Sequence, residues 1–191
     1  MQSAYRKHHS TETALLQVAN DRHQAIDNKC EAVLVLLDLS AAFDTIDHAI
    51  LLDRLQDRYG FSGTVLRWIK SYLKDRLQCI VLDKILSRPR YLSCGVPQGS
   101  VRGPLLFWLY IAPLEGIISA HRLNAMMYAD DTQLYIFMPK GNCFVASENL
   151  SQCLDDIMSW NLCNMLKCNP SKILKSSIFL PVFHLLNRLL D

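Results

Sequence analysis

The fold of this chain is decided by the stretch MMYADDTQLY, residues 126–135. Apolar and aromatic residues that favour strands flank two adjacent carboxylates, a pattern typical of a β-hairpin with Asp130 and Asp131 at its tip. Two adjacent negative charges repel each other unless a cation compensates them. Aspartate is also a common turn residue, so taken alone the pair is better explained as a solvated turn.

A second acidic strand end lies upstream in VLVLLDLSAAFD, residues 33–44. The uninterrupted apolar run predicts a strand buried on both faces, and Asp38 ends it. A carboxylate at the end of a buried strand needs a partner or a metal ion. Two such strand ends suit Mg²⁺, which is held by few carboxylates together with substrate phosphates. Asp44, in contrast, also fits a helix cap at the start of the amphipathic stretch that follows.

Between the two acidic sites lies the turn sequence CGVPQGS, residues 94–100, followed by the apolar run GPLLF, residues 103–107. Glycine and proline there demand special backbone angles and allow a ligand to approach the main chain closely. Ser100 is a candidate cap for the following helix, whose N-terminus favours phosphate. Such turns are common, so the loop gains its interest from its position between the two acidic strand ends.

Together the three segments resemble motifs A, B and C of reverse transcriptases, and in detail those of non-LTR (LINE-type) retrotransposons. Motif A corresponds to residues 38–44, with an acid, a short linker, an aromatic residue and a second acid. Motif B, GVPQGS, is present at residues 95–100, and motif C, YADD, at residues 128–131. Two further phrases resemble the family, HSTETAL at residues 9–15 and NPSK at residues 169–172. The resemblance covers nearly the whole chain up to about Lys172.

The resemblance implies a catalytic metal site. Asp38 and Asp130 match the two carboxylates that hold the metal ions, and Asp131 is the third acid of the set. The implied cofactor is Mg²⁺, as two ions, with Mn²⁺ as a possible substitute. Two such ions clamp the attacking and leaving oxygens of an in-line phosphoryl displacement.

The resemblance also assigns substrate-binding residues. Phe43 matches the aromatic residue that lies under the incoming sugar and rejects a 2′-hydroxyl, although core packing is the usual fate of phenylalanine. Pro97, Gln98 and Gly99 belong to the motif B loop that lies against the nascent base pair. Tyr128 matches the aromatic residue beside the primer end.

Lys172 matches the lysine of motif D that is proposed to donate a proton to the departing pyrophosphate. Without the family, a solvated surface lysine after an Asn-Pro turn is the better explanation of this residue. Ile173, which follows it, replaces a threonine that is usual in the family. Arg102 likewise stands where motif B usually has an apolar residue, which puts the seating of the loop in question.

The expected fold class is α+β: a polymerase palm, with an antiparallel sheet covered by helices on one face, plus part of the fingers and no thumb. Residues 1–173 are expected to form this partial reverse transcriptase domain, with residues 174–191 as a divergent tail. Helices are expected over residues 11–26, 46–58, 65–73, 105–118 and 150–160, and strands over residues 33–37, 78–82 and 91–94.

Composition is consistent with a globular domain but does not identify it. The chain has 191 residues, of which half are hydrophobic and a fifth are charged, and its net charge of +2 is too small to argue for nucleic acid. The segment 67–90 is locally basic, with seven arginines and lysines against two aspartates. It fits a template or primer backbone and a solvated helix face about equally well. The run 105–118 is too short and too interrupted to span a bilayer.

Two functional hypotheses therefore stand. In the first, the chain is an RNA-directed DNA polymerase domain that acts on an RNA template, a DNA primer and dNTPs, with no membrane partner. In the second, it is an inactive remnant of a truncated retrotransposon copy, at most a nucleic-acid or partner-binding module. Nucleus or cytoplasm is expected from the family alone, and the oligomeric state cannot be predicted.

Overall fold

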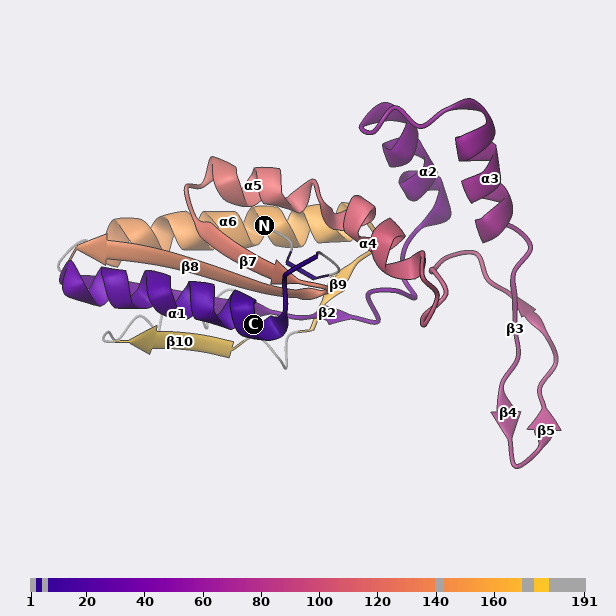
Figure 1. Ribbon diagram of the computed structural model, residues 1–191, viewed down its shortest axis with the longest axis horizontal. Coiled ribbons are helices and arrows are strands. Elements are labelled where there is room, and N and C mark those ends of the chain that lie inside the picture. The colour runs from indigo at the N-terminus through magenta and orange to yellow at the C-terminus, as the bar shows by residue number, and fades with distance from the viewer. Residues whose placement is uncertain (1–2, 5–6, 140–142, 170–173, 179–191) are drawn as a thin grey trace. The chain divides into compact units, whose positions relative to one another are not determined.

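The computed structural model describes residues 3–4, 7–139, 143–169 and 174–178 (Figure 1). The chain forms two compact units, and each is described here by itself. The first unit contains Met1–Ser40 and Ile111–Asp191, and the second contains Ala41–Tyr110.

The first unit is built on a four-stranded sheet with the strand order β10-β1-β8-β7. Its strands are β1 (Cys30–Leu37), β7 (Asn124–Tyr128), β8 (Asp131–Pro139) and β10 (Leu174–Ile178), and every neighbouring pair is antiparallel. The apolar strand β1 is central in the sheet, with its two edges paired to β8 and β10. Its composition is typical of a strand whose two faces are both covered. The α+β palm expected from the sequence is confirmed.

Helices cover both faces of this sheet. Leu134 and Tyr135 are adjacent on β8 and point to opposite faces, yet both are buried. On one face α1 (Thr11–Asp27) packs Ala14 against Met126 and Tyr135. The other two helices of this unit, α5 (Leu114–Ala120) and α6 (Cys143–Cys163), contact β7 and β8 and each other. The sequence predicts helices on one face of the sheet only, whereas in the structure α1 covers the second face as well.

The helix α1 begins where the sequence predicts. Ser10 is its N-cap, and a reciprocal capping box links the Ser10 side chain to the amide of Thr13 and the Thr13 side chain to the amide of Ser10. The hydroxyl of Tyr135 on β8 donates a 2.6 Å hydrogen bond to the carboxylate of Asp21, which fixes this helix on the sheet.

A short ladder extends the end of β1. After Asp38 the chain enters β2 (Leu39–Ser40), which pairs antiparallel with β9 (Lys167–Cys168), so that Leu39 faces Cys168. The strand β9 follows α6 by only a few residues. Through this ladder the segment after α6 reaches the acidic end of β1.

The second unit consists of helices and a long hairpin. The helices are α2 (His48–Asp57), α3 (Gly63–Leu73) and α4 (Gly103–Ile111), the last of which ends on the first residue of the other unit. In the hairpin, β3 (Leu77–Gln78) pairs with β6 (Arg90–Tyr91), and β4 (Val81–Leu82) pairs with β5 (Ile85–Leu86) at the tip (Figure 1).

Three elements differ from the sequence predictions. The cap of α2 is Asp47, which accepts a 2.9 Å hydrogen bond from the amide of Ile50, and Asp44 lies in the preceding turn. The apolar run 105–118 is divided into α4 and α5, because Pro113 lacks the N–H that a continuous helix needs. The last helix, α6, starts at Cys143 rather than near residue 150.

Within the described residues, the stretch Gly103–Ala120 has the length and apolar composition of a membrane span. Core helices of globular proteins share these properties, and 44% of the stretch is buried inside the protein. The break between α4 and α5 also interrupts it.

Candidate active site

The strand register brings the predicted carboxylates of the first unit to one end of the sheet. Leu37, the last residue of β1, pairs with Thr132 of β8. Because the strands are antiparallel, one further step along β1 leads to Asp38 and one step back along β8 leads to Asp131. Asp130 lies in the adjoining turn, since Tyr128 of β7 pairs with Asp131.

The turn between β7 and β8 is tight. Only Ala129 and Asp130 separate the paired residues Tyr128 and Asp131, and Ala129 has a φ of 55°. This left-handed conformation is unfavourable for a residue with a Cβ atom, so the hairpin holds the acidic tip in a strained backbone. The Tyr128 side chain is partly buried against the cluster of Met126 and Tyr135 beneath α1.

Asn169 contacts Asp38 twice, an interaction that no sequence pattern predicts. Its backbone amide donates a 2.8 Å hydrogen bond to the carbonyl oxygen of Asp38. Its side-chain amide nitrogen lies 3.3 Å from Oδ2 of the same aspartate. The preceding residue, Cys168, has a raised thiol pKa, because burial disfavours the thiolate and the negative charge of Asp38 adds to this effect.

The carboxylates at this end of the sheet have the chemistry that a hard divalent cation requires. Among the residues that the structure describes, no three His, Cys, Asp or Glu side chains form a cluster that could enclose a metal ion. Mg²⁺ does not need such a cage, because it keeps several waters and commonly takes one or two carboxylates plus substrate phosphates. Asp38 and Asp130 follow the paired ends of neighbouring strands, and their carboxylate oxygens are ligands of the type that such an open site uses.

In the second unit, the segment around Gly95 is tied to the turn that contains Phe43 and Asp44. The amide of Val96 donates to the carbonyl of Phe43 at 2.8 Å, and the amide of Gly95 donates to the carbonyl of Ile46 at 2.7 Å. Gly95 has a φ of 88°, and a Cβ atom built on it would lie 2.9 Å from the carbonyl oxygen of Asp44. Only glycine fits this close approach of two main chains.

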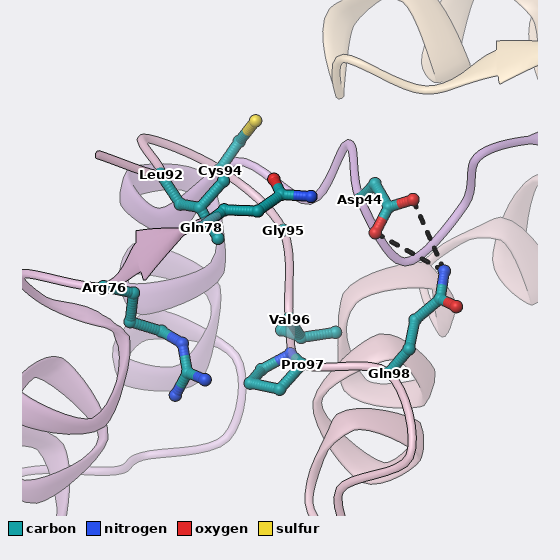
Figure 2. A pocket seen from close by; sticks show the side chains of 9 residues that line it. All are labelled: Asp44, Arg76, Gln78, Leu92, Cys94, Gly95, Val96, Pro97 and Gln98. Atoms are coloured by element: carbon teal, nitrogen blue, oxygen red, sulfur yellow. Dashed lines mark hydrogen bonds between the residues drawn. The ribbon is translucent and has the colours of Figure 1, made fainter. Parts of the chain in front are cut away.

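A cavity of about 530 Å³ opens beside this contact (Figure 2). It is lined by residues 95–98, by the polar residues Asp44, Arg76 and Gln78, and by Leu92 and Cys94. The side-chain amide of Gln98 lies 3.4 Å from both carboxylate oxygens of Asp44. Of the residues expected to bind substrate, Pro97 and Gln98 therefore line a pocket, and Gly99 follows them with a φ of 74°.

Phe43 stacks on Phe107 of α4 with ring centroids 4.7 Å apart and an angle of 27° between the ring planes. Phe107 is fully buried, whereas Phe43 is only partly buried. The ring of Phe43 is thus held by the core of the second unit while part of it remains accessible. This placement is compatible both with core packing and with contact to a ligand.

Arg102, which departs from the usual motif B pattern, has a structural partner. Its guanidinium lies 4.6 Å from the ring centroid of Trp68 on α3, a cation–π arrangement. The hydroxyl of Ser100 accepts a hydrogen bond from the amide of Gly103, the first residue of α4, so the expected capping role of Ser100 is confirmed. Tyr72 of α3 donates to the same hydroxyl at 3.2 Å.

The remaining predicted features lie elsewhere. The basic segment 67–90 does not form one helix face but runs from α3 into the exposed hairpin, and Arg76 alone of its basic residues lines the pocket. Lys172 and Ile173 lie outside the described residues. The first residue described after them, Leu174, opens β10 of the sheet, while the proposed boundary at residue 173 remains a prediction.

Comparisons with known proteins identify similar sequences and similar folds. The family model described as reverse transcriptase (RNA-dependent DNA polymerase) matches residues 1–178. The chain is 32% identical over 176 residues to the probable RNA-directed DNA polymerase from transposon BS of Drosophila melanogaster, and the match covers 90% of the chain and 19% of that protein. It is 31% identical over 166 residues to the RNA-directed DNA polymerase from mobile element jockey of Drosophila funebris, covering 83% of the chain and 18% of that protein.

The chain thus spans about a fifth of the length of these relatives. Among solved structures, telomerase from Candida albicans, in complex with a fragment of telomeric RNA, matches with a TM-score of 0.67 and 13% identity, covering 91% of the chain and 32% of that protein. Apo telomerase from Candida tropicalis matches with a TM-score of 0.62 and 11% identity, covering 88% of the chain and 35% of that protein. At these identities the structural matches show the fold alone.

Proposed function

Because the chain belongs to the reverse transcriptase family, we propose that it carries the palm chemistry of an RNA-directed DNA polymerase. In this proposal Asp38 and Asp130, with Asp131 as the third acid, hold the divalent metal ions of nucleotidyl transfer. The substrates are an RNA template, a DNA primer and dNTPs, and the reaction joins a primer 3′-hydroxyl to the α-phosphate of the incoming nucleotide.

One observation carries the proposal: the register of β1 and β8 directs Asp38 and Asp131 to the same end of one sheet, next to the turn that contains Asp130. Carboxylates on adjacent antiparallel strands are held by backbone hydrogen bonds and so need little reorganisation to share a ligand. Bound Mg²⁺, or Mn²⁺ in its place, would lower the pKa of the attacking hydroxyl and compensate the negative charge that develops on the phosphate.

In this proposal, residues of the second unit select the incoming nucleotide. Phe43, fixed by its stack on Phe107, places a rigid ring against the sugar and excludes a 2′-hydroxyl. Pro97, Gln98 and Gly99 present a backbone surface and an amide to the nascent base pair, and the bond between Gln98 and Asp44 orients that amide. Tyr128, at the end of β7, supports the primer terminus, and Lys172 is the proposed proton donor to pyrophosphate.

Basic side chains support the choice of nucleic acid as partner. Arg67 and Lys70 on α3, and Lys84, Arg88 and Arg90 on the hairpin, are exposed to solvent. Cations in such positions bind phosphate backbones through the release of condensed counterions, without reading sequence. The relatives' names, RNA-directed DNA polymerase, identify the template class to be tested first.

Primer extension on an RNA template tests the proposal directly. The 191-residue chain is expected to add dNTPs in the presence of Mg²⁺ or Mn²⁺. The isosteric change Asp130→Asn should lower the rate at least about a hundredfold, because metal-ion catalysis is worth several kcal/mol. The matched control is Asp155→Asn on α6, which removes the charge of an exposed carboxylate and should leave the rate unchanged.

Two outcomes would overturn the proposal. Equal rates for the wild-type chain and Asp130→Asn would mean that the Asp130 carboxylate does not hold a catalytic metal ion. No incorporation at any concentration of Mg²⁺ or Mn²⁺ would instead support the inactive remnant.

A further inference from the structure

We propose that Asn169 is a positioning residue that orients the carboxylate of Asp38 toward the metal ions. The proposal rests on the proposed function, because it assigns a role within the same site. Asn169 opens the phrase NPSK, residues 169–172, and no role was expected for it from the sequence. It binds Asp38 through both its backbone and its side chain.

The geometry of the two contacts fixes Asp38 at two points. The backbone amide of Asn169 donates to the carbonyl oxygen of Asp38 at 2.8 Å and so holds the main chain just beyond the end of β1. The side-chain amide of Asn169 lies 3.3 Å from Oδ2 and restricts rotation of the carboxylate. A carboxylate has about four acceptor positions on two oxygens, so one donor on Oδ2 restricts its rotation without using up its capacity to bind a cation.

An amide suits this position better than a charged group. The NH₂ of asparagine is a neutral donor, so it orients a carboxylate without competing with a divalent cation for its charge. A lysine or arginine there would neutralise the ligand, and an acid would repel it. Groups that orient the ligands of a metal commonly change metal affinity or activity by about 10- to 100-fold when they are lost.

Asn169 is itself held in place by the segment that follows α6. The ladder between β2 and β9 sets Cys168 opposite Leu39 and thereby aligns Asn169 with Asp38. Asn161, near the end of α6 and only 2% exposed, donates a 3.0 Å hydrogen bond to the sulfur of Cys168. The carbonyl of Asn161 also accepts a 2.8 Å bond from the amide of Leu166. The end of α6 thus supports the contact through two hydrogen bonds of Asn161.

Replacement of Asn169 by leucine tests the proposal, because leucine is similar in size, lacks a donor and keeps the backbone N–H. Asn169→Ala is the second variant, for the case in which leucine prevents folding. The matched control is Asn28→Leu. Asn28 is exposed, precedes the opposite end of β1 and donates its side-chain amide to the carbonyl of Gln24 rather than to Asp38.

The first readout is Mn²⁺ binding by water-proton relaxation, measured on the 191-residue chain with an RNA–DNA template-primer and no dNTP. Loss of the Asn169 amide should raise the Mn²⁺ concentration at half saturation about tenfold, while Asn28→Leu leaves it unchanged. The second readout is the Mn²⁺ dependence of primer extension, which should shift by a similar factor. Thermal unfolding of each variant checks that the fold is retained.

The outcomes separate this inference from the proposed function. Unchanged half saturation in a folded Asn169 variant would overturn the positioning role, even if that variant had lost stability. A tenfold shift in Mn²⁺ binding would support it, even if the wild-type chain incorporated no nucleotide. Absence of incorporation by the wild-type chain would count against the polymerase proposal but not against the positioning role of Asn169.

Discussion

Replacing Gly95 with alanine should destabilise the second unit strongly. The φ of 88° costs a residue with a Cβ atom about 1–2 kcal/mol. The added Cβ would also lie 2.9 Å from the carbonyl oxygen of Asp44, a backbone atom that cannot rotate away. Forcing this contact apart adds about 1–3 kcal/mol, so the free energy of unfolding should fall by about 2–5 kcal/mol in total.

Gly60→Ala provides the matched control for this substitution. Gly60 lies in the same unit and has a φ of 69°, but nothing lies within 4 Å of a Cβ atom built on it. It should therefore show only the backbone cost of about 1–2 kcal/mol. Urea unfolding followed by tryptophan fluorescence measures both, since two of the three tryptophans, Trp68 and Trp108, lie in this unit. Equal destabilisation by the two substitutions would refute the argument from the close approach to Asp44.

Three further predictions concern single side chains. Phe43→Val should raise the ratio of ribonucleotide to deoxyribonucleotide incorporation at least about tenfold, whereas the control Phe61→Val should leave this ratio unchanged. An unchanged ratio in Phe43→Val would mean that Phe43 is a core residue only. Burial, and then the charge of Asp156, raise the pKa of the Cys153 thiol to about 11. The protonated thiol therefore contributes its full share of stability below pH 9, and this share is lost as the pH rises through 11. Cys153→Ala should flatten the pH dependence of the unfolding free energy in that range, and an identical slope would contradict this. Arg102→Leu should cost about 0.5–1 kcal/mol in urea unfolding through the lost contact with the Trp68 ring, and a stabilised variant would contradict it.

Much of the fold could be predicted because local signals and tertiary structure agree. The helix expected from residue 11, the apolar run of β1 and the hairpin at residues 126–135 each follow from a local sequence pattern. The continuous apolar run 105–118 predicts one helix, whereas Pro113 lacks the N–H that a continuous helix needs and divides the run into α4 and α5. The position of α1 on the second face of the sheet depends on long-range packing, which no local pattern encodes.

In the candidate site too, some features follow from sequence motifs and others depend on the fold. The carboxylates could be named from the sequence because three separated motifs match one family, and the relatives from Drosophila mobile elements confirm that family. The contact of Asn169 with Asp38 could not be predicted, because it depends on the short ladder between β2 and β9. The pairing of Arg102 with Trp68 likewise joins residues far apart in sequence, and only the fold reveals it.

The central claim is that Asp38 and Asp130 share a divalent cation, and anomalous diffraction from crystals grown with Mn²⁺ tests it most directly. A manganese peak is predicted at the end of β1, within about 2.0–2.3 Å of oxygen atoms from both carboxylates. Manganese bound elsewhere, or side chains of Asp38 and Asp130 that turn away from each other, would contradict the account.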